Sequence, residues 1–309
     1  MSKQRIDTLL VDRGLAESPE KARALVMAGQ VLAAARPVSK PGMLVEETAA
    51  LEVARGPRYV SRGGEKLEHA LHSFGLDVSG LLCADIGSST GGFTDCLLQH
   101  GASRVYAVDV GKGQLDYGLR NDPRVVVMEG VNARHLEGLP EPVDFVSVDV
   151  SFISLRLVLP VVQGLLAQPG PGGRLKPAPQ EDVEGRLKPA PRGDVPTTGV
   201  RIHPDRGGGG ATGSIVVLFK PQFEAPKGKV PRGGVIRDVA LQALLIGGFV
   251  AWCAGNGFRV INLVASPILG AEGNREFLLW LRPAGDGAAE AGKSGICGAV
   301  ASEARETIH

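Results

Sequence analysis

Short apolar runs alternate with helical stretches through the central part of the chain. The runs are apolar at most positions with no strict alternation, which is the pattern of strands that are buried on both faces. This alternation predicts an α/β fold with a mostly parallel sheet covered by helices on both sides. The expected strands cover residues 81–86, 105–110, 125–128, 145–150 and 214–219, with further strand-like segments at 260–264 and 276–281. The expected helices include one that ends near residue 100, one over 155–166 and one over about 238–256.

A different pattern, of shorter elements, occupies residues 4–57. Ser18 is expected to cap a helix that begins at Pro19 and stops at Gly29. Short strands are expected at 31–32, 44–45 and 51–53. We therefore expect a small α+β domain over residues 1–58. Its early helical segments carry regularly placed basic residues, which on charge alone fit an ordinary solvated face: Arg5, Arg13, Lys21 and Arg23.

The alternation stops near residue 171. The hexapeptide RLKPAP occurs at 174–179 and again at 186–191, and four glycines occupy 207–210. Such a composition cannot sustain a core, so we expect a disordered surface insertion over 171–211, with a basic arm that touches RNA as the alternative. The small and polar residues 283–309 are expected to form a flexible tail. The larger domain is thus expected to span residues 59–282.

Composition limits the class of protein. The chain has 309 residues, of which 43% are hydrophobic, and this excludes wholesale disorder. The net charge of +1 excludes a uniformly basic nucleic-acid coat but not a local basic patch. No signal-peptide pattern and no apolar run of roughly 20 residues is present, so we expect a cytoplasmic protein without a membrane span. The four cysteines are widely spaced, which is typical of thiols in a reducing compartment and predicts no metal site: Cys83, Cys96, Cys253 and Cys297.

The strongest local signal for chemistry is a glycine-rich turn between an expected strand and an expected helix. It reads DIGSSTGGF at residues 85–93. It matches neither the dinucleotide pattern G-x-G-x-x-G nor a P-loop, so it lacks the elements that hold a pyrophosphate. Glycine lets a ligand approach the backbone closely. Asp109 ends the next strand, about 20 residues on, where an acid can accept hydrogen bonds from a ribose diol. A plain structural turn beside an exposed aspartate is the alternative.

A cofactor with an adenosine but no pyrophosphate suits this turn, and S-adenosylmethionine is the candidate. Its sulfonium is cationic, so Asp149, expected at the same rim of the sheet, is a favourable partner. Lys66 and Lys220 are expected at this rim too. Cations that share a cleft favour a neutral amine able to accept a proton, and Asp149 and Glu276 could orient them. A lone lysine is more often a solvated cation, and the spacing by itself does not establish the cluster.

Five segments of the larger domain carry long motifs. They read YVSRGGEKL at 59–67, DIGSSTGGFTD at 85–95, VDVSFIS at 148–154, LFKPQFE at 218–224 and GNREFL at 273–278. In this order they resemble the TlyA family of hemolysin-named ribosomal RNA methyltransferases. The resemblance covers residues 4–282 apart from the insertion, and residues 4–57 resemble an S4-like RNA-binding domain. It implies a Rossmann-like, FtsJ-like methyltransferase fold. It also implies methyl transfer from S-adenosyl-L-methionine to a ribose 2′-hydroxyl of ribosomal RNA, with ribosomal subunits as partners.

The family's site residues fall on matching positions of this chain. Its Lys-Asp-Lys-Glu tetrad falls on Lys66, Asp149, Lys220 and Glu276. We assign Lys220 as the general base, oriented by Asp149 and Glu276, with Lys66 disfavouring its charged form or binding the substrate. The implied cofactor-binding residues are Asp85, Gly87, Ser88, Ser89, Thr90, Gly91, Gly92, Phe93, Asp109, Val110, Asn132, Ala133 and Asp149. The expected RNA-binding residues are Arg5, Arg13, Ser18, Lys21 and Arg23, with a basic loop at 227–237.

The chain departs from the family pattern in two places. The insertion at 171–211 lies just before the strand that carries Lys220, which bears on the rim of the sheet. Ala33, Ala34 and Ala35 stand where such modules often have an Asn-Gly turn, which bears on the conformation of that turn. A membrane-active hemolysin would need an amphipathic or spanning segment, and the longest apolar stretch, 241–252, is too short to span a bilayer. A non-catalytic RNA-binding or ribosome assembly factor would bind RNA without methyl transfer, and it leaves the tetrad unexplained.

Overall fold

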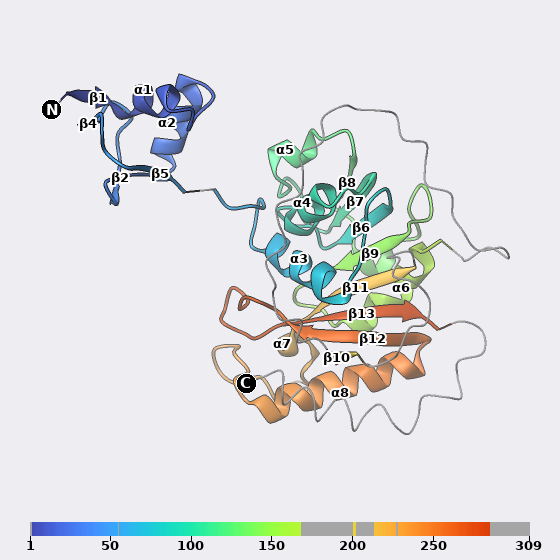
Figure 1. The fold of residues 1–309 in the computed structure, drawn as a ribbon. Coiled ribbons are helices and arrows are strands. Elements are labelled where there is room, and N and C mark those ends of the chain that lie inside the picture. Colours follow the sequence, from blue (N-terminus) through green and yellow to red (C-terminus); the bar gives the residue numbers. More distant parts are fainter. Residues whose placement is uncertain (1, 55, 168–199, 202–212, 227, 285–309) are drawn as a thin grey trace. The chain divides into compact units, whose positions relative to one another are not determined.

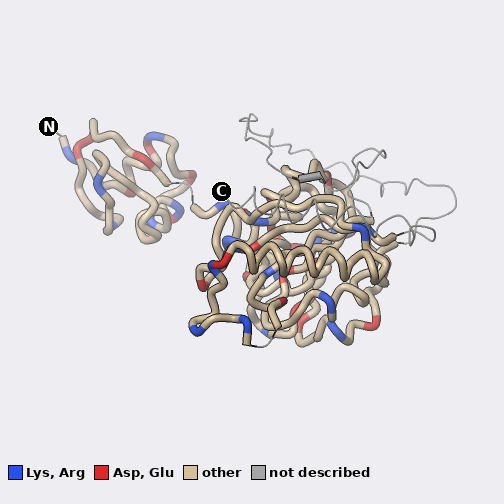
Figure 2. The backbone as a smooth tube through the Cα atoms, turned by 90° about the horizontal axis from the view of Figure 1, so that it is seen from below, with Lys and Arg blue, Asp and Glu red and all other residues tan. Residues whose placement is uncertain are grey.

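The computed structural model describes residues 2–54, 56–167, 200–201, 213–226 and 228–284. The chain divides into two compact units, Met1–Arg58 and Tyr59–His309, and each is described by itself (Figure 1). Basic and acidic residues are interspersed along both units (Figure 2). The predicted insertion at 171–211, except for 200–201, and the predicted tail, except for 283–284, lie outside the described residues.

The described residues of the smaller unit form two short helices and five short strands. Ser18 caps α2 as expected, because its Oγ accepts a hydrogen bond from the backbone N–H of Lys21 at 3.2 Å. The helices are α1 (Ile6–Asp12) and α2 (Pro19–Met27), and the strands are β1 (Lys3–Arg5), β2 (Val31–Ala33), β3 (Arg36–Pro37), β4 (Leu44–Glu46) and β5 (Leu51–Val53). β1 pairs with β4, and β2 lies between β3 and β5. The buried core is formed by Ile6, Leu9, Leu10, Ala16, Ala22, Val26, Val31, Ala33, Val38 and Val45.

A two-residue turn joins β2 to β3, and both of its residues are alanines. Ala33 pairs with Arg36 across the turn. Ala34 has a φ of 49° and Ala35 a φ of 61°. Both angles lie in the left-handed region, which suits asparagine or glycine and costs another residue about 1–2 kcal/mol. The hairpin therefore forms without its Asn-Gly pair, but with a strained backbone.

In its described residues the larger unit is built on an eight-stranded sheet with the order β10-β12-β13-β11-β9-β6-β7-β8. Its parallel strands are β6 (Leu82–Ile86), β7 (Arg104–Asp109), β8 (Val125–Glu129), β9 (Phe145–Val148) and β11 (Ser214–Phe219). β13 (Phe277–Pro283) runs antiparallel to both β11 and β12 (Phe258–Ala265). The predicted α/β class with a mostly parallel sheet is confirmed.

The short strand β10 (Val200–Arg201) pairs antiparallel with β12 at the edge of the sheet. These two residues lie within the segment predicted to be a disordered insertion, so the prediction is wrong for them. A two-residue strand is too short to carry a hydrophobic period, which is why the pattern did not reveal it.

Helices cover both faces of this sheet (Figure 1). Ile215 and Val217 of β11 belong to a hydrophobic cluster with α6 and α8, whereas Val216 and Leu218 belong to a cluster with α3 and α4. Because successive strand residues point to opposite faces, each strand has to be mostly apolar on both faces, as its sequence is. The longer helices are α3 (Gly63–Phe74), α4 (Gly92–Gln99), α6 (Leu159–Leu165) and α8 (Val239–Gly255). Shorter elements are α5 (Tyr117–Arg120), α7 (Pro221–Glu224), η1 (Ala133–His135) and η2 (Leu155–Leu157).

The order of the strands reverses between β6 and β9. From β6 the chain adds β7 and β8 on one side of the sheet and then returns to add β9 on the other side. In open parallel sheets a crevice forms at the carboxyl ends of the strands at such a point, and ligands bind there. Gly87 follows β6 and Asp149 follows β9. A site is therefore expected where these two residues meet.

Candidate active site

The glycine-rich turn after β6 is shaped by close contacts. Gly87 has a φ of 86°, and a Cβ at this position would overlap the backbone oxygen of Asp149 at the end of β9. A Cβ on Gly92 would overlap Ser61 and come within 2.9 Å of the backbone nitrogen of Gly64. These glycines therefore bring three segments together: the turn, the end of β9 and the start of α3. This close packing places Lys66 of α3 at the edge of the crevice.

The crevice contains two cavities that meet at this turn. The first, here called the lysine cavity, is lined by Lys66, Lys220, Glu276 and Asp149 and by most of the turn: Gly87, Ser88, Ser89, Thr90, Gly92 and Phe93. The second, here called the Asp109 cavity, is lined by Asp109, Val110, Asn132, Ala133 and Asp149, with Gly87 and Ser89. Asp149 lines both cavities, so it lies at their junction.

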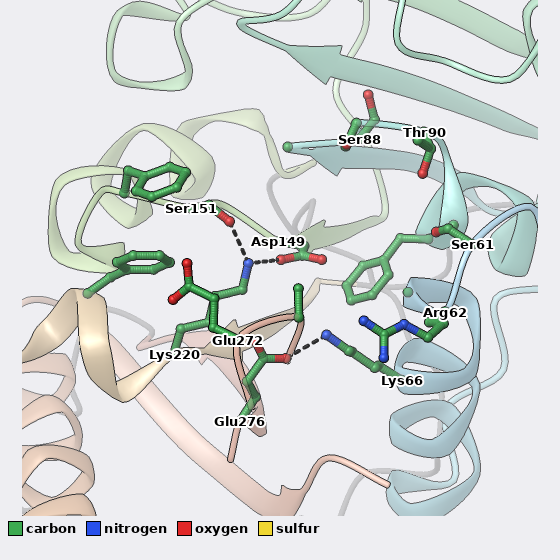
Figure 3. Close-up of a pocket in the computed structure, with 18 of the residues that line it drawn as sticks. Ser61, Arg62, Lys66, Ser88, Thr90, Asp149, Ser151, Lys220, Glu272 and Glu276 are labelled. Carbon is green, nitrogen blue, oxygen red and sulfur yellow. Dashed lines mark hydrogen bonds and ion pairs between the residues drawn. The ribbon is translucent and has the colours of Figure 1, made fainter. Parts of the chain in front are cut away.

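The lysine cavity contains two ion pairs (Figure 3). Lys220 Nζ lies 2.7 Å from Asp149 Oδ1 and donates a hydrogen bond of 2.8 Å to Ser151 Oγ. Lys66 Nζ lies 2.5 Å from Glu276 Oε2, and both of these side chains are almost entirely buried. Each lysine is thus held by its own carboxylate. The expectation that Glu276 orients Lys220 is wrong in this geometry, because Glu276 pairs with Lys66.

The carboxylate of Asp109 is held by the backbone around it. It accepts hydrogen bonds from the N–H groups of Ser89, at 2.8 Å, and Gly111, at 2.7 Å. Asn132 caps η1, since its side chain accepts a hydrogen bond of 3.0 Å from the N–H of Arg134. Both side chains are therefore fixed at the wall of the Asp109 cavity, and a carboxylate oxygen retains further acceptor capacity for a hydroxyl group.

Asp85 lies beneath the turn rather than at the cavities. Its carboxyl is fully buried and accepts hydrogen bonds from Thr94 Oγ1 at 2.7 Å and Ser147 Oγ at 3.2 Å. Burial, opposed by the hydrogen bond from Thr94 and reinforced by the charge of Asp149, raises the pKa of Asp85 to about 7. The described residues that line the two cavities do not include Asp85 or Gly91, so direct contact of these two with a cofactor has no support in the geometry.

Comparison with known proteins identifies the larger unit. A family profile described as FtsJ-like methyltransferase matches residues 59–283, and one described as S4 domain matches residues 4–50. The chain belongs to the FtsJ-like methyltransferase family. The expected resemblance, fold class and enzyme class are confirmed by these matches.

Relatives of known name cover nearly the whole methyltransferase. It is 39% identical over 291 residues to the 16S/23S rRNA (cytidine-2′-O)-methyltransferase TlyA of Mycobacterium tuberculosis. The aligned region covers 93% of this chain and 92% of the relative. It is 37% identical over 277 residues to hemolysin A of Brachyspira hyodysenteriae, covering 89% and 98% of the two chains. A solved structure of a hemolysin-named protein from Streptococcus thermophilus aligns with a TM-score of 0.61 at 35% identity, over 99% of this chain and 97% of that one. In the described part of the methyltransferase, every helix is too short or too polar to cross a bilayer.

Several residues at the site of the methyltransferase were not given a role by the sequence. Phe152 lines both cavities, is 86% exposed and has a φ of 63°, which is rare for a bulky residue. Its ring centroid lies 5.1 Å from that of Phe223. Glu224 holds the segment that carries Phe152, because its carboxylate accepts hydrogen bonds from the N–H of Leu155 at 2.6 Å and from Ser154 Oγ at 2.8 Å. The motifs VDVSFIS and LFKPQFE contain Phe152, Ser154, Phe223 and Glu224, but only contacts between the motifs reveal what these residues do.

The expected RNA-binding residues of the smaller unit all have partners within that unit. Arg5 and Arg23 lie 2.7 Å and 3.4 Å from Asp7 Oδ2, and the hydrogen bond from Arg5 is the main cause that lowers the pKa of Asp7 to about 2. Arg13 donates hydrogen bonds to the backbone oxygens of Glu47 and Ala49, Lys21 pairs with Glu17, and Ser18 caps α2. The arginines and Lys21 are nevertheless exposed on the surface, where a guanidinium keeps donors for a further acceptor.

Proposed function

We propose that this methyltransferase transfers the methyl group of S-adenosylmethionine to a ribose 2′-hydroxyl of ribosomal RNA. The observation that carries the proposal is the Lys220–Asp149 ion pair at the junction of the two cavities. The Asp109 cavity then has room for a cofactor and the lysine cavity for a nucleotide. The basic group of Lys220 lies in the lysine cavity, next to the Asp149 carboxylate that both cavities share. The name of the Mycobacterium tuberculosis relative supports the same reaction.

The Asp109 cavity fits the adenosine part of the cofactor. Asp109 has acceptor capacity for the ribose hydroxyls, and Val110, Asn132 and Ala133 offer a wall for the adenine ring. Gly87 lines both cavities, and its lack of a side chain lets the turn pack directly against the backbone of Asp149. When bound, S-adenosylmethionine supplies an electrophilic methyl group on a positively charged sulfur. The negative charge of Asp149 at the junction favours such a cation.

In the proposed reaction Lys220 receives the proton of the 2′-hydroxyl. The hydroxyl oxygen would form the new bond to the methyl carbon, with the electron pair of the broken sulfur–methyl bond left on the cofactor's sulfur. The hydroxyl proton would pass to Lys220 Nζ after that amine has released the proton that it carries in the ion pair with Asp149. Asp149 and Ser151 fix the direction of that amine. Lys66 and Glu276 form the opposite wall, where the lysine can hold the ribose or its phosphate. Positioning of this kind contributes much of the rate of a transfer reaction.

The smaller unit is proposed to bind structured ribosomal RNA through its phosphates. The S4 domain match supports this, as do the exposed side chains of Arg5, Arg13, Lys21 and Arg23. Phosphate contacts position a protein on RNA without specifying sequence. Ser18 is assigned to the helix cap rather than to a direct RNA contact, because its hydroxyl already accepts from Lys21.

The test is transfer of labelled methyl groups to each purified ribosomal subunit from cells that lack this enzyme. We expect label in the RNA, at a linkage that resists alkaline hydrolysis because the 2′-oxygen is blocked. Label on a base, or none on either subunit, would contradict the proposal. A second experiment measures the affinity for S-adenosylmethionine. The substitution Gly87→Ala should abolish binding of this cofactor. Gly138→Ala, at a position with open space around its Cβ, should bind it normally.

A further inference from the structure

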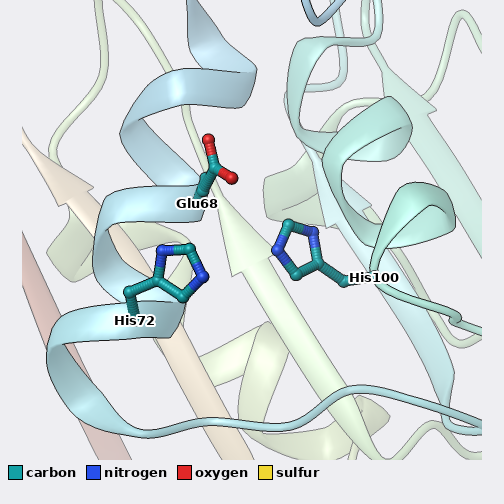
Figure 4. A group of neighbouring side chains, drawn as sticks. All are labelled: Glu68, His72 and His100. Carbon is teal, nitrogen blue, oxygen red and sulfur yellow. The ribbon is translucent and has the colours of Figure 1, made fainter. Parts of the chain in front are cut away.

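A cluster of three possible metal ligands lies outside the two cavities (Figure 4). Glu68 and His72 are four residues apart on α3, so their side chains share one face of that helix. His100 follows α4, which packs against α3. One ligand atom from each of the three side chains lies within 4.8 Å of the other two. The cysteine spacing predicted no metal site, but the fold brings together a different set of possible ligands.

The ring of His100 is already oriented for metal binding. Its Nδ1 lies 2.8 Å from the backbone oxygen of Cys96, an acceptor that requires the proton to be on Nδ1. Nε2 then carries the free lone pair, and Figure 4 shows the ring facing Glu68 and His72. A hydrogen bond from the other ring nitrogen to a backbone carbonyl is the usual support of a metal-binding histidine.

We propose that Glu68, His72 and His100 bind a Zn²⁺ ion. Two imidazoles and one carboxylate form a set that Zn²⁺ takes with a water in the fourth position. Ligands at 2.0–2.1 Å in a tetrahedron are about 3.3 Å apart, so the ligand atoms need to approach by up to about 1.5 Å. The exposed side chain of His72 is free to make that movement by rotation.

The bound ion would link two helices that frame the lysine cavity. Glu68 lies two residues after Lys66 on α3, and α4 begins at Gly92 of the glycine-rich turn. The site lies outside the lining of both cavities, so its role is structural. The proposal does not depend on the reaction assigned to the enzyme.

The test is calorimetric titration of the tag-free full-length chain with Zn²⁺ after treatment with a chelator. We expect one equivalent to bind, and His72→Gln to weaken that binding at least about tenfold. His135→Gln is the matched control, because His135 is an exposed histidine outside the cluster, and its Zn²⁺ affinity should equal that of the parent. Zn²⁺ should also raise the unfolding temperature of the parent more than that of His72→Gln.

The opposite results would overturn the proposal: no Zn²⁺ binding in the micromolar range by the parent chain, or equal affinity in His72→Gln and His135→Gln. Since His72 is exposed, its replacement should leave the fold intact, and circular dichroism checks this. Co²⁺ provides a second readout. The parent should show the strong visible absorption of tetrahedral Co²⁺ and His100→Gln should not, whereas the same spectrum from both would exclude His100 as a ligand.

Discussion

Lys220 and Asp149 follow two neighbouring parallel strands and meet at the same edge of the sheet, with Nζ 2.7 Å from Oδ1. The register of β11 and β9, in which Val217 pairs with Val148, brings the two side chains together. They are 10% and 22% exposed, so the pair is largely shielded from water. The topology of the sheet therefore fixes the amine in the lysine cavity, beside the carboxylate of Asp149 that lines both cavities.

Replacing Asp149 with asparagine keeps the shape of the side chain but removes its charge. Lys220 then loses its ion-pair partner, and the orientation of the amine is lost with it. We expect kcat to fall at least about 100-fold at saturating RNA and cofactor, in line with the usual contribution of a positioned acid–base group. Steady-state kinetics measure this. Asp77→Asn, an exposed position outside the site, should keep the parent rate, and a kcat for Asp149→Asn within about threefold of the parent would exclude the role.

Phe152 combines an exposed ring with a strained backbone, so stability and activity should separate there. Phe152→Gly relieves the left-handed φ of 63° and should raise the unfolding temperature. The same change removes an aromatic surface on which a nucleobase can stack, a contact worth about 1–3 kcal/mol, so kcat/KM for RNA should fall by about 5- to 150-fold. Thermal melts and kinetics test the two effects. Leu157→Ala is the control for loss of an exposed apolar group in the same segment, and a fall of equal size there would contradict the stacking role.

Asp85 should make stability depend on pH. Its folded-state pKa of about 7 lies above the ordinary aspartate value, so the folded state binds the proton more tightly than the unfolded chain. The stabilisation is therefore complete below about pH 4 and is lost as the pH rises to about 7. Asp85→Asn carries no titrating proton, and the parent should lose stability relative to this variant between about pH 4 and 7. Urea midpoints across this range measure the difference, and parallel curves would contradict the assignment.

The turn between β2 and β3 should accept a stabilising change. Ala34→Asn combined with Ala35→Gly provides residues that tolerate the φ angles of 49° and 61°, and we expect a gain of about 1–2 kcal/mol. Slower amide hydrogen exchange over residues 31–38 of the full chain is the measurement. Ala50→Gly, whose φ is not positive, should give no gain because it only adds freedom to the unfolded chain. Equal or faster exchange in the double variant would show that the turn is not strained.

Local patterns were sufficient for the framework of the fold. Continuous apolar runs predicted β6, β7, β8, β9 and β11 because helices cover both faces of the sheet, and Ser18 with Pro19 predicted the start of α2. The glycine-rich turn could be recognised because its chemistry is contained in consecutive residues. The role of Asp109 as a candidate ribose-binding acid could be predicted from its distance along the chain to that turn.

Contacts between distant residues could not be predicted in the same way. Lys66 and Glu276 are separated by 210 positions, and only their resemblance to a family tetrad joined them. The sequence did not reveal which carboxylate holds which lysine, because the pairing is set by the register of β11 with β9 and by the approach of α3. Asp85 belonged to the correct motif, yet its side chain points into the core. Glu68, His72 and His100 are brought together only by the packing of α3 on α4.

The role of Lys220 as the proton acceptor is the central claim, and Lys220→Ala tests it most directly. The measurement is transfer of labelled methyl groups to ribosomal subunits, together with the affinity of the variant for S-adenosylmethionine. Lys112→Ala, an exposed lysine that lines neither cavity, is the matched control. We predict that Lys220→Ala binds the cofactor but transfers no methyl group, whereas Lys112→Ala retains the parent rate. Near-normal transfer by Lys220→Ala would contradict the account.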